Sequence, residues 1–192
     1  ISNKKIPTKS TVEEIRARFD ADVERFSNLE TGQSAIVDAP LAMELITRSA
    51  VVATPKIDRV LDIGCGAGNN AIRLAREYKG DFACDLCDLS HPMLDRAQER
   101  LSKELSADIR TFHGDFREID FEAESYDVII AAAVLHHLRD DADWEFAFEK
   151  IHRLLSLGGS LWVTDLVAQE TAGIDKLIRG KYGAYLESLG GP

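Results

Sequence analysis

The stretch VLDIGCGAGNNAIRLA, residues 60–75, decides the fold. A short apolar run at 60–63 leads into glycines at every second position (Gly64, Gly66 and Gly68), and a helical pattern begins at Asn69. Three glycines so close together exceed what a tight turn needs, and without side chains they let a ligand approach the backbone. The stretch therefore predicts a strand, a ligand-binding loop and a helix, although a strand-to-helix turn without a ligand is the alternative.

The same alternation continues along the chain. We expect further strands at 82–87, 109–113, 128–132 and 161–166. Helices are expected at 69–78, 92–105, 141–155 and 170–189. Ser90 would be the N-cap of the second of these helices, and the LGG at 157–159 would be the C-cap of the third. The connection 114–127 is too short for a full helix. Apolar strands separated by helices predict an α/β fold with a doubly wound, mostly parallel sheet, whose ligands bind beyond the carboxyl ends of the strands.

The residues before 59 are organised differently. Ser10 and Glu13 match a capping box at the start of a helix over 10–26, and a second apolar helix is expected at about 40–52. We predict that residues 1–58 form an N-terminal helical lid on a core of residues 59–192.

Composition narrows the classes of partner. The chain has 192 residues, 45% of them hydrophobic, and a net charge of −10, which disfavours a nucleic-acid partner. Its longest uncharged apolar run, 128–135, is far shorter than the about 20 residues of a membrane span, and residues 1–10 lack the apolar segment of a signal peptide. We expect a cytoplasmic protein with no membrane partner.

The three cysteines Cys65, Cys84 and Cys87 are odd in number and sparse, and they predict unpaired thiols. The CxxC spacing at 84–87 falls on a predicted strand, which sends the two side chains to opposite faces.

Three acids lie at or near the carboxyl ends of the first three predicted strands. Asp62, Asp88 and Asp115 would converge on one crevice, where they repel a polyphosphate but suit a ligand with an ammonium group, a vicinal diol and an exocyclic amine. Asn69 replaces the last glycine of a dinucleotide GxGxxG fingerprint, and the chain has no GxxxxGK[ST] loop.

Several segments, in order and spacing, match a known family. VLDIGCGAG at 60–68, CDLSHPML at 87–94, GDF at 114–116, YDVIIAAAVLHHL at 126–138 and LGGSLWVTDL at 157–166 resemble the class I S-adenosylmethionine-dependent methyltransferases over about residues 59–166. The resemblance implies a Rossmann-like sheet of order 3-2-1-4-5, S-adenosylmethionine as cofactor and S-adenosylhomocysteine as product.

The resemblance also implies roles for individual residues. Gly64, Gly66 and Gly68 would contact the methionine and ribose of the cofactor, and Asp62 would orient that loop and the methionine ammonium group. Asp88 would bind both ribose hydroxyls. At the adenine, Asp115 would accept a hydrogen bond from the amine, Phe116 would offer its backbone amide, and Leu89 and Met93 would pack on the ring; Cys65 and Ala132 are the other two expected cofactor-binding residues. Asp88 as a helix cap and Asp115 as a turn residue remain alternatives.

Methyl transfer is an in-line displacement, so a general base is needed only if the acceptor must lose a proton. The candidate is His136, with a strand-end hydrogen bond or a surface position as the alternative reading. The AAAV at 131–134 replaces the [ND]PP[YF] motif of enzymes that methylate amino groups of bases or glutamine, which favours a small-molecule acceptor. We expect no metal site, because the adjacent histidines diverge.

Other readings stay open. The RFDADVERF helix at 18–26 loosely resembles the lid of carboxy-S-adenosylmethionine synthases, and a noncatalytic methyltransferase-like binding or assembly module is a further alternative. A nicotinamide dehydrogenase is disfavoured by Asp62 and Asn69. The family adds strands 6 and 7, for which residues 168–192 offer no pattern; we expect a longer natural chain or an edge completed by another chain, as in a homodimer.

Overall fold

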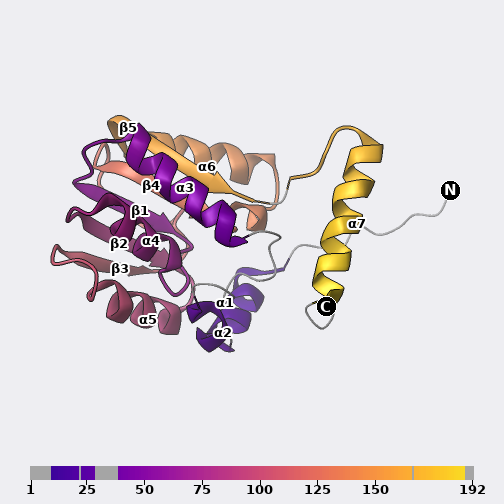
Figure 1. The fold of residues 1–192 in the computed structure, drawn as a ribbon, viewed down its shortest axis with the longest axis horizontal. Helices are drawn as coiled ribbons and strands as arrows, with labels where there is room; N and C mark the ends of the chain where they lie inside the picture. The colour runs from indigo at the N-terminus through magenta and orange to yellow at the C-terminus, as the bar shows by residue number, and fades with distance from the viewer. Residues whose placement is uncertain (1–9, 22, 29–38, 166, 189–192) are drawn as a thin grey trace.

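The computed structural model describes residues 10–21, 23–28, 39–165 and 167–188 (Figure 1). Strands and helices alternate from residue 59 onward, as the sequence predicts. Their bounds are α1 Val12–Ala21, α2 Val23–Ser27, α3 Ala39–Ala53, β1 Arg59–Ile63, α4 Asn69–Tyr78, β2 Ala83–Asp88, α5 His91–Leu101, β3 Ile109–His113, β4 Tyr126–Ala132, the 3-10 turn η1 Leu135–His137, α6 Asp141–Leu154, β5 Leu155–Thr164 and α7 Ala172–Ser188.

The strands form one parallel sheet of order β3-β2-β1-β4-β5, which confirms the predicted Rossmann-like architecture. Val60 of β1 lies between Cys84 of β2 and Val128 of β4, so the strand that carries the glycine loop is central. The sheet order reverses beside β1, where the loops after β1 and β4 diverge, and a ligand crevice is expected there.

Each face of the sheet carries its own apolar core. Val60 and Cys84 pack with α3, α4 and α5, whereas Leu61 and Cys87 pack with α6 on the other face. The CxxC spacing therefore does place its two thiols on opposite faces, and Cys65, Cys84 and Cys87 are all free and buried. Burial in apolar surroundings raises the pKa of each of these thiols, so they stay protonated.

Most predicted helices have nearly the observed bounds, but one ends early. α5 is capped by Ser90, whose Oγ accepts from the backbone N–H of Met93, as expected. It ends at Leu101 rather than Leu105, because a turn follows in which Leu105 still packs into the same core and so continues the apolar spacing. The connection from β3 to β4 contains no helix, which confirms the expectation for 114–127.

Two predicted caps are wrong. The capping box at α1 is formed by Thr11 and Glu14, where Thr11 Oγ1 accepts from the N–H of Glu14 at 3.2 Å and Glu14 Oε2 accepts from the N–H of Thr11 at 2.8 Å, and not by Ser10 and Glu13. The LGG segment is not a C-cap but lies inside β5. A Cβ on Gly159 would come within 2.7 Å of the Tyr126 carbonyl oxygen, so this glycine allows β5 to approach β4.

The helices outside the alternating core differ in how they attach to it. α3 contributes Ile46 and Ala50 to the same core as β1, α1 and α2 lie beside α5, and α7 stands away from the sheet (Figure 1). The boundary at residue 58 stays a prediction, and Leu166 and Leu189, the predicted ends of a strand and a helix, lie outside the described residues. Within the described ranges, no helix has both the length and the apolar character needed to span a lipid bilayer.

Candidate functional site

A cleft opens at the carboxyl ends of β1, β2 and β3, where the sequence predicts a ligand. The core supplies most of its wall and α1 supplies the rest. The lining residues are Ser10, Val12, Ile15, Ile63, Gly64, Cys87, Asp88, Leu89, Gly114, Asp115, Phe116, Arg117, Val134, His137, Leu138 and Arg139. Of the predicted cofactor set, this wall includes Gly64, Asp88, Leu89, Asp115 and Phe116.

The glycine loop requires glycine for two different reasons. Gly64 and Gly66 have φ of +64° and +51°, in the left-handed region that other residues avoid. A Cβ on Gly64 would lie 2.5 Å from Cγ2 of Val134, so this glycine allows the loop to pack on the segment after β4. Among the described residues, no atom lies within 4 Å of a Cβ placed on Gly66, so the space beside Gly66 is open to a ligand on their side.

Asp88 connects the end of β2 to the glycine loop. One carboxylate oxygen accepts the N–H of Gly66 at 2.8 Å and the other accepts the N–H of Ser90 at 2.9 Å. Burial raises the pKa of Asp88, the two amides oppose that shift, and the carboxylate of Asp20 in α1 adds to it. The carboxylate keeps lone pairs for further donors, since each oxygen can accept more than one hydrogen bond.

Asp62 is fully buried under the loop, and among the described residues neither of its carboxylate oxygens has a hydrogen bond of normal length and angle. Burial raises its pKa to about 8, the backbone amide of Ala71 opposes the shift, and the Asp88 carboxylate adds to it. A buried acid with two unmatched acceptors is costly unless it is protonated or meets a donor. Burial therefore favours the neutral, protonated form of Asp62, whose side chain lies behind the cleft wall rather than on it.

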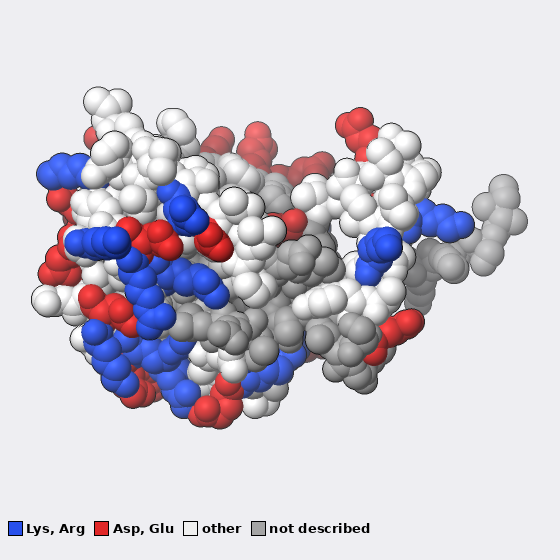
Figure 2. Space-filling view, in the orientation of Figure 1, with Lys and Arg blue, Asp and Glu red and all other residues white. Residues whose placement is uncertain are grey.

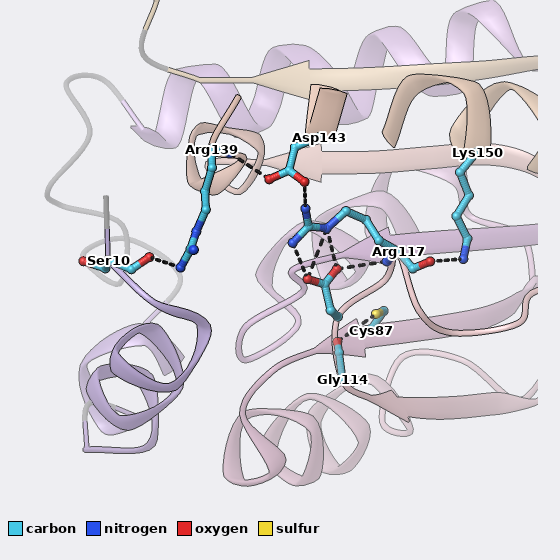
Figure 3. Close-up of polar contacts among 8 residues, drawn as sticks. Ser10, Cys87, Gly114, Arg117, Arg139, Asp143 and Lys150 are labelled. Carbon is cyan, nitrogen blue, oxygen red and sulfur yellow. Dashed lines mark hydrogen bonds and ion pairs between the residues drawn. The ribbon is translucent and has the colours of Figure 1, made fainter. Parts of the chain in front are cut away.

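Arg117 joins Asp115 to a network, missed by sequence reasoning, whose members Arg117, Asp143 and Lys150 are labelled in Figure 3. Arg117 donates to both carboxylate oxygens of Asp115, at 2.6 Å through Nη2, and also forms an ion pair with Asp143 at the start of α6. Burial acts to raise the pKa of Asp115, but the guanidinium and backbone N–H of Arg117 outweigh it and lower that pKa. The buried ammonium of Lys150 in α6 donates to the carbonyls of Arg117 and Ile119 and so fixes the loop after β3.

The two adjacent histidines have different surroundings. His136 Nδ1 lies 2.8 Å from Oδ1 of Asp165, whose Oδ2 accepts the backbone N–H of His136 at 2.9 Å. A carboxylate that fixes one imidazole nitrogen is the arrangement that orients a general base. His136 does not line the cleft, whereas His137 does and meets the ring of Phe19 in α1 edge-on, with centroids 6.4 Å apart.

The remaining predicted residues surround the cleft without lining it. Cys65, Met93 and Ala132 are buried, and Gly66, Gly68 and Asp62 also lie off the wall. Sequence reasoning missed the α1 residues of the wall and the partners Arg117 and Asp165, because such pairings depend on tertiary contacts that no local motif encodes. Across the described part of the chain, no three His, Cys, Asp or Glu side chains gather as metal ligands would.

The surface charge is uneven despite the net negative charge. Figure 2 shows Lys and Arg side chains gathered over α4 and α5, with Asp and Glu among them. Three of these cations have carboxylate partners: Arg76 pairs with Glu104, Arg96 with Glu24 and Lys103 with Glu99. Such exposed pairs contribute little to stability, but they neutralise much of the patch.

Comparison with known sequences agrees with this geometry. A family model described as a methyltransferase domain matches residues 60–159. An uncharacterized methyltransferase of Mycobacterium tuberculosis is 35% identical over 108 residues, 56% of this chain and 50% of the relative. The 27-O-demethylrifamycin SV methyltransferase of Amycolatopsis mediterranei is 34% identical over 62% of this chain and 42% of its own length. The carboxy-S-adenosyl-L-methionine synthase of Helicobacter pylori is 29% identical over 68% and 53%. The chain spans about half the length of these relatives.

Solved structures share the fold. The [4+2]-cyclase SpnF superposes with a TM-score of 0.64 at 21% identity, over 85% of this chain and 63% of that one. A DhpI–SAM–HEP complex superposes with a TM-score of 0.62 at 15% identity, over 87% and 71%. At these identities the likeness concerns the fold alone.

Proposed function

Since the chain belongs to the methyltransferase domain family of class I, S-adenosylmethionine-dependent enzymes, we propose that it transfers the methyl group of S-adenosylmethionine to a small-molecule acceptor and leaves S-adenosylhomocysteine. The observation that carries the proposal is the buried Asp88 carboxylate, which lines the cleft at the end of β2 and is bonded to the glycine loop through Gly66.

The residues present fit this cofactor. The space beside Gly66 admits a ligand, and the unmatched oxygens of Asp62 lack a donor such as a loop amide or an ammonium group would provide. In the proposed complex, Asp88 binds the ribose hydroxyls through its spare lone pairs and Asp115 accepts from the adenine amine alongside Arg117. The backbone N–H of Phe116 would donate to the ring, and Leu89 and Met93 would pack on it. Gly64, Cys65 and Gly68 shape the loop, and Ala132 the end of β4.

The chain's own contribution to the reaction is alignment. S-adenosylmethionine, when bound, supplies a methyl group on a sulfonium that is already activated for displacement. The glycine loop and the acids fix the cofactor, and the wall formed by α1 and the segment after β4 holds the acceptor in line. Where the acceptor must lose a proton, we propose that His136, which is oriented by Asp165 and lies next to the wall residue His137, accepts it from an acceptor that reaches past the wall.

A small acceptor is supported by two observations. At the end of β4, residues 131–134 read AAAV, without the [ND]PP[YF] motif of enzymes that methylate amino groups of bases or glutamine. The wall of the cleft includes the apolar residues Val12, Ile15, Val134 and Leu138, and small-molecule pockets are mostly apolar. The relative named for a rifamycin derivative is consistent with such an acceptor. The cytoplasmic location and the homodimer expected from the sequence stay predictions.

One alternative has specific support. The similarity to a carboxy-S-adenosyl-L-methionine synthase favours, as a second candidate, a relative that alters the cofactor itself. Incubation with methyl-labelled S-adenosylmethionine and a panel of small acceptors separates the two. Label in an acceptor together with S-adenosylhomocysteine supports methyl transfer, whereas label retained in a heavier cofactor derivative supports the alternative. Cofactor binding without either product would identify a noncatalytic module.

A further inference from the structure

Helix α1 and the preceding Ser10 border the cleft, and α2 packs beside α5, so this segment is anchored on both sides of the cleft. Ser10, Val12 and Ile15 lie on the cleft wall, and the Ser10 carbonyl accepts a long hydrogen bond from Arg139, at 3.4 Å (Figure 3). At the other end of α1, the Asp20 carboxylate accepts from the hydroxyl of Ser90, next to Asp88. We refer to residues 10–28 as the lid, of which the structure describes all but residue 22.

Some anchors of the lid are exposed, whereas two come from buried core residues, Ser90 and Asn69. The ion pair between Glu24 and Arg96 lies at the surface, where such pairs are weak. Asn69, the first residue of α4, is only 4% exposed, and its Nδ2 donates to the carbonyls of Phe26 at 3.0 Å and Asn28 at 3.4 Å. A buried amide that satisfies backbone carbonyls is costly to remove, because those carbonyls then lose their donor.

Arg100 in α5 fixes the orientation of that amide. Its Nη1 donates to Oδ1 of Asn69 at 2.8 Å and to the carbonyl of Ala67, within the glycine loop, at 2.6 Å. Unlike Arg76, Arg96 and Lys103 on the same face, Arg100 makes its hydrogen bonds to neutral oxygens. One guanidinium thus holds both the loop that is proposed to contact the cofactor and the residue that holds the lid.

The lid contacts also extend to the cleft wall. Phe26 packs on Phe19 with ring centroids 5.2 Å apart, and Phe19 meets His137 of the wall edge-on. Movement of the Asn69 amide would therefore be transmitted through the two phenylalanines to the cleft. We propose that Asn69, oriented by Arg100, is a positioning residue that couples closure of the lid to the conformation of the glycine loop, and thereby retains the cofactor. This inference rests on the proposed function.

The sharpest variant is Asn69→Asp. It keeps an oxygen for Arg100 and suits a helix N-terminus, but it replaces the donor to Phe26 and Asn28 with a carboxylate that those carbonyls repel. We expect S-adenosylhomocysteine, measured by surface plasmon resonance, to dissociate at least tenfold faster, with a smaller change in its association rate. Arg100→Met should act in the same direction, and Arg76→Met, which removes an exposed guanidinium from α4, serves as the matched control.

A second readout separates coupling from simple loss of stability. In the wild type, saturating S-adenosylhomocysteine should slow amide hydrogen exchange in the lid and in residues 64–70 together. In Asn69→Asp the same ligand, also at saturation, should still protect residues 64–70 but no longer the lid. Wild-type dissociation rates in both variants, or a wild-type lid whose exchange ignores bound ligand, would overturn the inference. A wild-type chain that binds no S-adenosylhomocysteine would instead refute the proposed function.

Discussion

Replacement of Asp88 by alanine tests the proposed ribose contact. Asp88 is 9% exposed, and its two oxygens already accept backbone N–H groups at 2.8 and 2.9 Å, so its position is fixed before a ligand arrives. A hydrogen bond to a charged group contributes about 1.5–3 kcal/mol. Loss of about 2–3 kcal/mol from the ribose contact corresponds to roughly 30- to 150-fold weaker binding of S-adenosylhomocysteine in Asp88→Ala.

The assay is isothermal titration calorimetry of S-adenosylhomocysteine, with thermal melting of each variant as the check on folding. Asp81 offers a matched control, because its Oδ1 also accepts two backbone N–H groups, from Ser106 and Ala107 at 3.1 Å each, but it lies in the loop before β2. Asp81→Ala should cost some stability and leave the affinity unchanged. A folded Asp88→Ala variant with affinity within about twofold of wild type would refute the ribose assignment.

The remaining predictions concern the loop, the buried acid and the histidine. Gly66→Val should abolish S-adenosylhomocysteine binding in calorimetry because its side chain enters the open space of the loop, and normal binding would place the cofactor elsewhere. Asp62 ionises near 3.8 when unfolded and near 8 when folded, so its contribution to stability is fully present below the lower value and is lost as pH rises to the upper one. The unfolding free energy of the ligand-free wild type, measured against Asp62→Asn by chemical denaturation, should therefore fall by up to about 1.4 kcal/mol per pH unit across that window; a constant difference would contradict the burial argument. His136→Ala should leave cofactor affinity unchanged and slow turnover only for acceptors that must lose a proton, and a weakened affinity would contradict its placement off the cleft wall.

Local sequence patterns were sufficient to predict the parallel strands and most helices of the core. Alternation of apolar strands with helices gave α4 and β3 their bounds, and the spacing of Asp88 from the glycines placed it at the end of β2. These features follow from the periods of strands and helices and from positions after strand ends, which a single sequence displays.

The predictions of two helix caps failed where the local sequence fits two arrangements equally well. Ser10 with Glu13 and Thr11 with Glu14 both satisfy the capping-box spacing, and only the packing of the following helix selects the second pair. At Gly159 a glycine beyond a helix suggested a cap, whereas close contact with the Tyr126 carbonyl explains it.

The candidate site was predictable where its residues lie at or just after strand ends, as Gly64, Asp88, Leu89, Asp115 and Phe116 do. The ion pairs of Arg117 and the pairing of His136 with Asp165, 29 residues apart in sequence, depend on the meeting of separate elements. The same is true of the lid, whose contacts with Asn69 and His137 have no signature in the sequence.

The central claim is that the cleft beside Asp88 binds S-adenosylmethionine. Its most direct test is calorimetric titration of the wild-type chain with S-adenosylmethionine, S-adenosylhomocysteine and NADH under identical conditions. We expect micromolar binding of the first two and none of NADH. Preferential binding of NADH, or no binding of any of the three to the folded chain, would contradict it.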